Sequence, residues 1–161
     1  MGRPAVTLLI AVLLFSAGCA VPALQEPTIT LAGVTVENVT RESIDLSLRL
    51  VVDNPNPVGA TLARVSFDAY FLDGGQWVFL AHGEQDGIAI RPEDETTVTI
   101  PVTVDNLRLV QAFLRALRDG AITLRVSGTG IVDYGIATFE IPFERTLEVR
   151  PGQAVTAATA K

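Results

Sequence analysis

The stretch that decides the fold is Ile44–Asp53, IDLSLRLVVD. Charged and polar side chains alternate in it with apolar ones, which stand at Ile44, Leu46, Leu48, Leu50 and Val52. Successive side chains of a strand point to opposite faces, so this period of two predicts a β-strand with one face on a core and one in water. A helix would instead scatter the charges through its apolar stripe.

The same alternation runs through the chain on both sides of this strand. It predicts further strands at 29–36, 64–71, 77–83, 88–90, 97–104, 122–126 and 139–149. About seven short strands joined by tight turns are typical of an antiparallel two-sheet sandwich. We therefore expect an all-β fold, a sandwich of immunoglobulin or fibronectin type III class.

Three local signals refine this prediction. Apolar residues change face across Ala32-Gly33, which indicates a glycine bulge. Asp73-Gly74-Gly75-Gln76 has the composition of a hairpin turn. Pro101 cannot donate to a ladder of hydrogen bonds, so its strand is expected at a sheet edge.

One segment has the period of a helix. The apolar residues in it are Leu107, Val110, Phe113, Leu114 and Leu117. Asp105 or Asn106 can cap its start, and Gly120 follows its end. This short amphipathic helix is predicted to cover an open end of the sandwich, and a helix for a membrane surface or a partner is the alternative.

The first residues have the three parts of a secretory signal. Arg3 provides a positive charge, residues 5–15 are apolar, and the small residues Ser16-Ala17-Gly18 precede Cys19. Small residues before a cysteine resemble the lipobox of bacterial lipoproteins, in which that thiol receives a diacylglyceryl group and becomes the new N-terminus. The resemblance implies a signal peptide at 1–18 and lipid on Cys19.

Residues 19–27 would then form a lipidated tether to the membrane. An uncleaved membrane anchor over 4–24 and ordinary secretion are the alternatives, and all three place the domain outside the cytoplasm. Ala20 stands where an Asp would resemble the inner-membrane retention signal. This favours the outer membrane, facing the periplasm, if the host is diderm.

Composition limits the partners and the chemistry. The chain has 161 residues with 12 basic and 18 acidic ones, and loss of residues 1–18 removes only Arg3, which leaves a formal charge of −7. This acidity argues against nucleic acid as a partner. Because Cys19 is the only cysteine, the expected domain at 28–150 has neither a disulfide nor a reactive thiol. The residues after it, 151–161, are aperiodic and are expected to be disordered.

No set of residues predicts a catalytic, metal or cofactor site. His82 is the only histidine, which we interpret as a surface residue. Glu93, Asp94 and Glu95 are consecutive, so they diverge rather than converge on a cation. Gly128 and Gly130 precede no helix, unlike the glycines of a phosphate loop.

The most distinctive short motif is Asn54-Pro55-Asn56-Pro57, directly after the deciding strand. A residue before proline is pushed towards extended geometry, and an asparagine amide can satisfy nearby backbone groups. We interpret the motif as a stiff structural exit from the strand.

At this motif the chain resembles a known family. Leu48–Pro57 (LRLVVDNPNP) is similar to the signature of the water stress and hypersensitive response (WHy) domain, of the type 2 late embryogenesis abundant group. The resemblance continues through a strand ending at Gly83, residues 88–104 (IAIRPEDETTVTIPVTV), the helix and residues 122–128 (ITLRVSG), and spans about 28–149. It implies a β-sandwich with one helix, and a non-enzymatic role in desiccation or other stress.

One departure from the family pattern is the long hairpin at 73–81, DGGQWVFLA. Its Trp77 and Phe79 form a candidate contact patch for a ligand or partner, or they pack onto the sandwich. Two functions are thus expected. One is a protective, lipid-anchored envelope protein, and the other is a membrane-tethered module that recruits an envelope protein or an apolar ligand.

Overall fold

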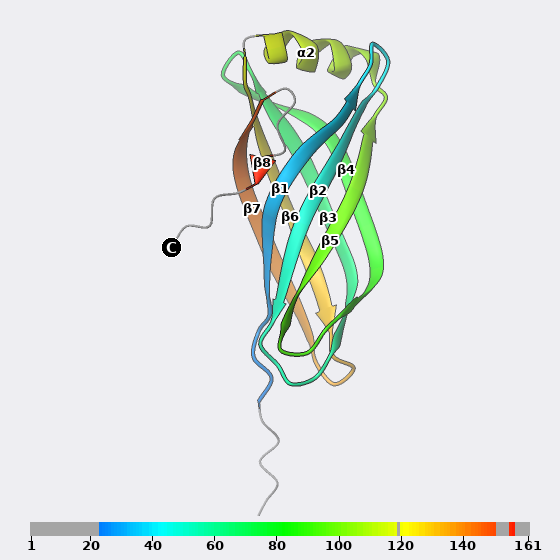
Figure 1. Ribbon diagram of the computed structural model, residues 1–161, viewed down its shortest axis with the longest axis vertical. Coiled ribbons are helices and arrows are strands. Elements are labelled where there is room, and N and C mark those ends of the chain that lie inside the picture. The colour runs from blue at the N-terminus through cyan, green and yellow to red at the C-terminus, as the bar shows by residue number, and fades with distance from the viewer. Residues whose placement is uncertain (1–22, 119, 151–154, 157–161) are drawn as a thin grey trace, which may run out of the picture.

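The computed structural model describes residues 23–118, 120–150 and 155–156. Two four-stranded antiparallel sheets face each other with one short helix across an end (Figure 1). The elements are β1 Thr28–Val39, β2 Ile44–Asn54, β3 Ala60–Asp73, β4 Gln76–Ile90, β5 Asp94–Val104, α2 Leu107–Arg118, β6 Ile122–Asp133, β7 Thr138–Val149 and β8 Val155–Thr156. Over the described residues, the predicted all-β sandwich with one helix is confirmed.

The strand that decided the prediction lies inside its sheet. The strand order is β5-β2-β1-β8 in one sheet and β4-β3-β6-β7 in the other. The five alternating apolar side chains of β2 are buried to 1% exposure or less. The intervening Asp45 stays on the outer face, where it accepts a hydrogen bond from Thr103 of β5 at 2.9 Å.

The three local signals are also confirmed. The pairing of β1 with β2 shifts register between Leu31 and Gly33, as expected of a bulge. Gly74 and Gly75 both have positive φ, at 56° and 83°, in the turn that pairs Asp73 with Gln76. Positive φ at both central residues is the geometry of a two-residue hairpin. Pro101 lies on β5, an edge strand.

The prediction of two separate strands at 77–83 and 88–90 is wrong, because β4 runs unbroken from Gln76 to Ile90. The intervening Glu84, Gln85 and Asp86 are polar and exposed, so their sequence looks like a loop. They nevertheless pair with β3, where Arg64 contacts Glu84 at 3.3 Å and Asp86 at 3.5 Å. Backbone pairing along a long neighbour extends the strand where the side chains give no signal.

The last strand also departs from the sequence analysis, which expects disorder throughout 151–161. Val155–Thr156 form β8, which pairs with Gly33 and Val34 of β1. The outer edge of β1 offers backbone groups that a short segment can pair with, whatever its side-chain pattern. The other residues after Arg150 lie outside the described residues.

A row of glycines and phenylalanines crosses the second sheet. Gly83, Phe67, Gly128 and Phe143 stand opposite one another on β4, β3, β6 and β7. A Cβ on Gly83 would overlap the Phe67 ring, and a Cβ on Gly128 would lie 2.7 Å from Phe143 Cζ. Each ring therefore occupies the space above a glycine backbone, which makes this row a tightly packed part of the core.

The helix closes one end of the sandwich, as the sequence predicts (Figure 1). Asn106 caps it, since Asn106 Oδ1 accepts hydrogen bonds from the backbone N–H groups of Arg108 and Leu109. Val110 and Phe113 are fully buried, and the Phe113 ring meets Phe71 of β3 edge-on at 6.0 Å between centroids. We call this the helix end.

The opposite end holds the loops β2–β3, β4–β5 and β6–β7, together with the residues that lead into β1 (Figure 1). Because the motif Asn54-Pro55-Asn56-Pro57 lies there, we call it the asparagine end.

Candidate functional site

The asparagine end contains two buried polar side chains. Asn54 is 0% exposed and Asn56 is 2% exposed. Burying an amide without hydrogen-bond partners costs free energy, so the partners of these two side chains indicate their role in the fold.

Asn54 ties three loops together. Its Nδ2 donates to the carbonyl oxygens of Val58 and Arg91, both at 2.9 Å. Its Oδ1 accepts from the backbone N–H of Asn56 at 3.0 Å and from the phenol of Tyr134 at 2.7 Å. The side chain thus joins the β2–β3 loop to the β4–β5 turn and to the β6–β7 hairpin.

Asn56 holds the segment that enters the domain. Its Nδ2 donates to Gln25 O and to Tyr134 Oη, both at 2.8 Å, and its Oδ1 accepts from Gln25 N at 2.7 Å. The backbone carbonyl of Asn56 accepts from Glu93 N at 2.9 Å. One amide therefore pairs with both backbone groups of Gln25, as a neighbouring strand would.

Tyr134 completes this network from a distance of 80 residues along the chain. Burial raises the pKa of the Tyr134 phenol, and the hydrogen bond with Asn56 acts in the lowering direction. The hydroxyl is therefore a neutral donor at physiological pH. Its ring meets Phe139 edge-on at 5.8 Å, which fixes the hairpin.

The arrangement is a clamp rather than a reactive site. Both asparagine amide groups engage other parts of the protein. Pro55 and Pro57, each directly after one of the asparagines, are exposed and have no N–H groups to satisfy. The sequence predicts local pairing of the motif with nearby backbone. It gives no signal for Gln25 or Tyr134, because partners this distant are set by the fold.

The candidate patch at Trp77 and Phe79 lies on the outer face of the second sheet. Both side chains are exposed, and Tyr70 and Arg125 join them there. The Arg125 guanidinium lies 4.6 Å from the Trp77 ring centroid and 5.2 Å from that of Tyr70, while Tyr70 meets Phe79 edge-on at 5.7 Å. We call these four residues the aromatic patch.

A register shift explains why this patch faces outward. Between Ala69 and Tyr70 the pairing with β4 skips Leu80, so Leu80 and Ala81 are both buried. The residues before the shift, Trp77 and Phe79, consequently point away from the core. Within the patch Arg125 Nε is buried without a hydrogen-bond partner, so cation–π contact is its main compensation.

The other sequence candidates lie apart from both regions. His82 Nδ1 contacts Asp68 Oδ1 at 2.9 Å on the exposed sheet face. Glu93 sits in the β4–β5 turn with a φ of 49°, and Asp94 pairs with Arg91 at 3.0 Å. Gly128 and Gly130 are in strand β6. Cys19 and the expected signal at 1–18 lie outside the described residues.

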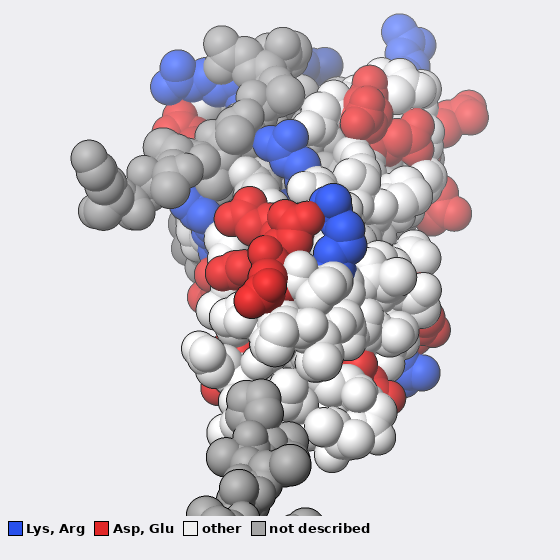
Figure 2. Space-filling model, turned by 60° about the horizontal axis from the view of Figure 1, so that its bottom comes forward, with Lys and Arg blue, Asp and Glu red and all other residues white. Residues whose placement is uncertain are grey.

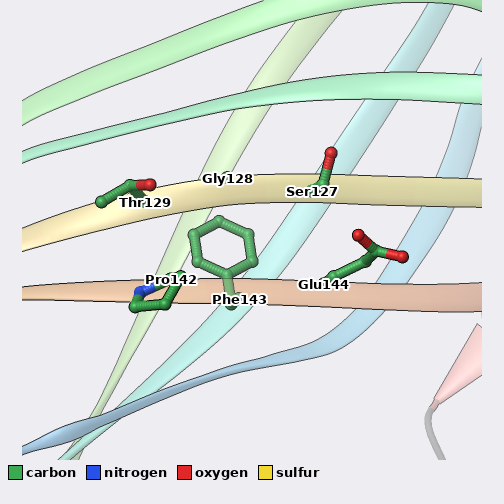
Figure 3. Close-up of a pocket in the computed structure, with 6 residues that line it drawn as sticks. All are labelled: Ser127, Gly128, Thr129, Pro142, Phe143 and Glu144. Carbon is green, nitrogen blue, oxygen red and sulfur yellow. The ribbon is translucent and has the colours of Figure 1, made fainter.

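A hollow of about 400 Å³ lies on strands β6 and β7, and Figure 3 shows its lining residues. They are Ser127, Gly128, Thr129, Pro142, Phe143 and Glu144. The Phe143 ring points towards Gly128, which has no side chain to meet it. The hollow thus accompanies the glycine and phenylalanine row. Of its polar lining side chains, Ser127 is half-buried and Glu144 is exposed.

Neither a metal site nor a membrane-spanning helix is found in the described residues. Among them, no three His, Cys, Asp or Glu side chains gather as metal ligands would. Within the same part of the chain, no helix combines the length and apolar content that crossing a bilayer requires.

The fold and the clamp together define a class: a small two-sheet β-sandwich whose loops at one end are held by an asparagine motif. The chain belongs to the late embryogenesis abundant family whose model, described as "Late embryogenesis abundant protein", matches residues 49–147. An uncharacterized protein of Methanocaldococcus jannaschii is 34% identical over 126 residues, which cover 78% of this chain and 71% of that protein.

Solved structures share the fold. The solution structure of AT1g01470 from Arabidopsis thaliana has a TM-score of 0.59 at 21% identity, over 80% of this chain and 83% of that one. The solution structure of a late embryogenesis abundant (LEA) protein, At2g46140.1, also has a TM-score of 0.59, at 18% identity, over 89% of this chain and 84% of that one. The crystal structure of a protein from Archaeoglobus fulgidus has a TM-score of 0.53 at 16% identity, over 81% of this chain and 99% of that one.

Proposed function

We propose that this protein is a non-enzymatic, lipid-anchored envelope protein that protects its surroundings during desiccation or other stress. The observation that carries the proposal is the family match over 49–147, which includes the second half of the deciding strand and the whole asparagine motif. The WHy domain is the group within this family that the motif resembles.

The anchor is supported by the sequence before the domain. An apolar stretch at 5–15 and the small residues Ser16-Ala17-Gly18 lead to Cys19, the only cysteine of the chain. Two or three acyl chains on this residue would hold the protein stably at a membrane. With Ala20 after it, the proposed location in a diderm host is the outer membrane, facing the periplasm.

The first experiment tests the anchor. The full-length protein and a Cys19→Ala variant are expressed in a bacterium, the envelope is fractionated, and the intact mass of each mature chain is measured. We expect a wild-type mass that begins at Cys19 with an added diacylglyceryl group, absent from the variant. A mature chain that begins elsewhere without lipid, or retains residues 1–18, contradicts the anchor.

The second experiment tests protection. A host strain lacking the protein is compared with strains that carry the wild type or Cys19→Ala, and survival is counted after drying and rehydration. We expect the deletion to reduce survival and the wild type to restore it more fully than the unanchored variant. Equal survival of all three strains contradicts a protective role.

A second candidate function is a membrane-tethered binding module. The aromatic patch favours it, since two exposed rings and a cation on a sheet face are typical of a contact surface for a protein or an apolar ligand. The test is a pull-down from the envelope with the wild type and with Trp77→Ala/Phe79→Ala. One stoichiometric partner that the double variant loses would favour recruitment over general protection.

A further inference from the structure

Two large apolar side chains at the asparagine end are exposed. Ile136, at the tip of the β6–β7 hairpin, is 80% exposed, and Val58, in the β2–β3 loop, is 46% exposed. Pro55 and Pro57 are exposed beside Val58. Ile136 is the most exposed of the large apolar residues in the described part of the chain.

Both loops lack charge over their whole length. No Asp, Glu, Lys or Arg occurs in residues 54–63 or 134–139. Figure 2 brings this end of the molecule forward: the surface beside the grey segment is largely uncharged, and a group of acidic side chains with basic ones beside it lies above that surface on the same face. Apolar, uncharged loop tips can enter the head-group region of a bilayer, where charged ones would have to lose their hydration.

The two loops are held as one unit. Asn56 in the first loop donates to Tyr134 Oη in the second at 2.8 Å. Within the hairpin, Tyr134 N donates to Ala137 O at 2.9 Å and Gly135 N donates to Asp133 Oδ1 at 2.8 Å. The clamp therefore presents Ile136 and Val58 on a preorganised surface rather than on two independent loops.

The same clamp also fixes where the chain leaves the domain. Asn56 pairs with both backbone groups of Gln25, so the segment towards Cys19 departs from the asparagine end. Gln25 lies six positions after Cys19, and a chain of six steps spans at most about 20 Å. An anchor on Cys19 would therefore keep this end close to the membrane.

We propose that the asparagine end docks on the lipid surface, with Ile136 and Val58 inserted among the head groups. The inference rests on the proposed lipid anchor, which supplies the proximity. The occupant of this apolar surface is the membrane that carries the anchor, and the helix end then faces away from it. The domain stands on the membrane in one orientation.

The charges around the tips set the preferred lipid. Glu26 and Glu93 are exposed at this end, Asp133 accepts within the hairpin turn, and the nearby cation Arg91 is paired with Asp94. This net negative charge opposes an anionic surface. Docking is therefore stronger on zwitterionic than on anionic lipid, and salt reduces the difference by screening.

The experiment uses the lipidated full-length protein on phosphatidylcholine vesicles. Lipidated Cys19 leaves no free thiol, so Ile136→Cys introduces a single one, which is labelled with an environment-sensitive fluorophore. Leu107→Cys provides the matched control, because Leu107 is 53% exposed at the helix end. We expect the label at 136, but not at 107, to shift to shorter wavelength and to be quenched by nitroxide lipid.

A second variant and a flotation assay separate the two proposals. Ile136→Glu combined with a label at Val58→Cys should abolish the wavelength shift seen with Val58→Cys alone, while the protein still floats with the vesicles. Flotation with an unshifted label at 136 overturns docking and leaves the anchor intact. Failure to float overturns the anchor and, with it, the proximity on which docking rests.

Vesicles that contain phosphatidylglycerol test the charge argument. We expect a smaller shift at 136 on these vesicles in low salt, and recovery towards the phosphatidylcholine value in high salt. A larger shift on the anionic vesicles, or equal shifts at 136 and 107 on either lipid, contradicts docking through these two tips.

Discussion

The two ends of the sandwich are closed by different means. At the helix end, Val110 and Phe113 fill the opening with apolar side chains that pack against Phe71. At the asparagine end, Asn54 and Asn56 fill it with amides that hydrogen-bond to four loops or segments. Both pairs are buried to 2% exposure or less.

The difference follows from what each end must cover. A helix satisfies its own backbone groups, so the face it turns to the core can be wholly apolar. Three loops converging with an incoming segment bring unpaired carbonyl and N–H groups, which need polar partners if they are buried. The helix end is therefore stabilised by the packing of apolar side chains, and the asparagine end by the pairing of donors with acceptors. Substitutions at each end can test these two contributions separately.

The largest expected effect is at the helix end. Phe113→Ala removes a fully buried ring and leaves a cavity beside Phe71, which should lower the free energy of unfolding by about 4 kcal/mol. Urea unfolding measures the change. Leu107→Ala, on the exposed part of the same helix, is the control, with an expected loss below about 0.5 kcal/mol. Similar losses of unfolding free energy in both variants would contradict the role of the buried helix face in closing this end.

The next effect tests pairing at the other end. Asn54→Asp keeps the shape but replaces the donor that serves Val58 O and Arg91 O with an acceptor. Leaving these carbonyls unpaired should lower the free energy of unfolding by about 3 kcal/mol at neutral pH. Asn38→Asp, an exposed position on β1, is the matched control in the same urea experiment. A loss no greater than in the control would show that shape alone closes this end.

A smaller effect concerns how the helix is set in place. Asn106→Ala removes the acceptor for the N–H groups of Arg108 and Leu109 and should lower the free energy of unfolding by about 1 kcal/mol. Asn106→Asp keeps an acceptor and should retain most of the stability. Thermal unfolding followed by circular dichroism compares the three proteins, and equal loss in both variants would argue against capping.

The smallest effect is expected at Tyr134, and its contribution to the free energy of unfolding should depend on pH. Tyr134→Phe removes one hydroxyl from a network that keeps other partners, so we expect the free energy of unfolding to fall by about 0.5 kcal/mol. Burial raises the pKa of this phenol in the folded state above its ordinary value of about 10. Above that pH the unfolded state releases the proton first, so wild-type stability should fall as pH rises.

The measurement is the urea midpoint of the wild type and of Tyr134→Phe from pH 8 upwards. The contribution of Tyr134 is fully present below about pH 10 and is lost as pH rises towards the folded pKa, so the two midpoints should converge there. A constant difference between them across this range would contradict a buried phenol in the clamp.

The ease of prediction also differs between the two ends. The helix end could be predicted from the sequence, because the stripe through Val110 and Phe113, the cap at Asn106 and Gly120 are all local signals. At the asparagine end the sequence showed that Asn54 and Asn56 would serve backbone groups nearby. It could not show Tyr134 or Gln25, since no local pattern links residues that the fold brings together from a distance.

The strands show the same division. Alternation predicted β2 with its buried face, and the bulge near Gly33 and the turn at Gly74-Gly75 had their own residue signals. The unbroken course of β4 was missed, because its polar middle is a strand only through its pairing with β3. The aromatic patch was predicted at Trp77 and Phe79 but not at Arg125, which joins it from another strand.

The row of Gly83, Phe67, Gly128 and Phe143 has a consequence for refolding. If β4 slipped by two residues along β3, Ala81 or Gln85 would stand opposite Phe67, and a side chain would occupy the space that the ring now fills. The ring thus accepts one alignment of the strands and rejects its neighbours. In a protein proposed to act through cycles of drying and rewetting, this row would favour the native strand register each time the sheet re-forms.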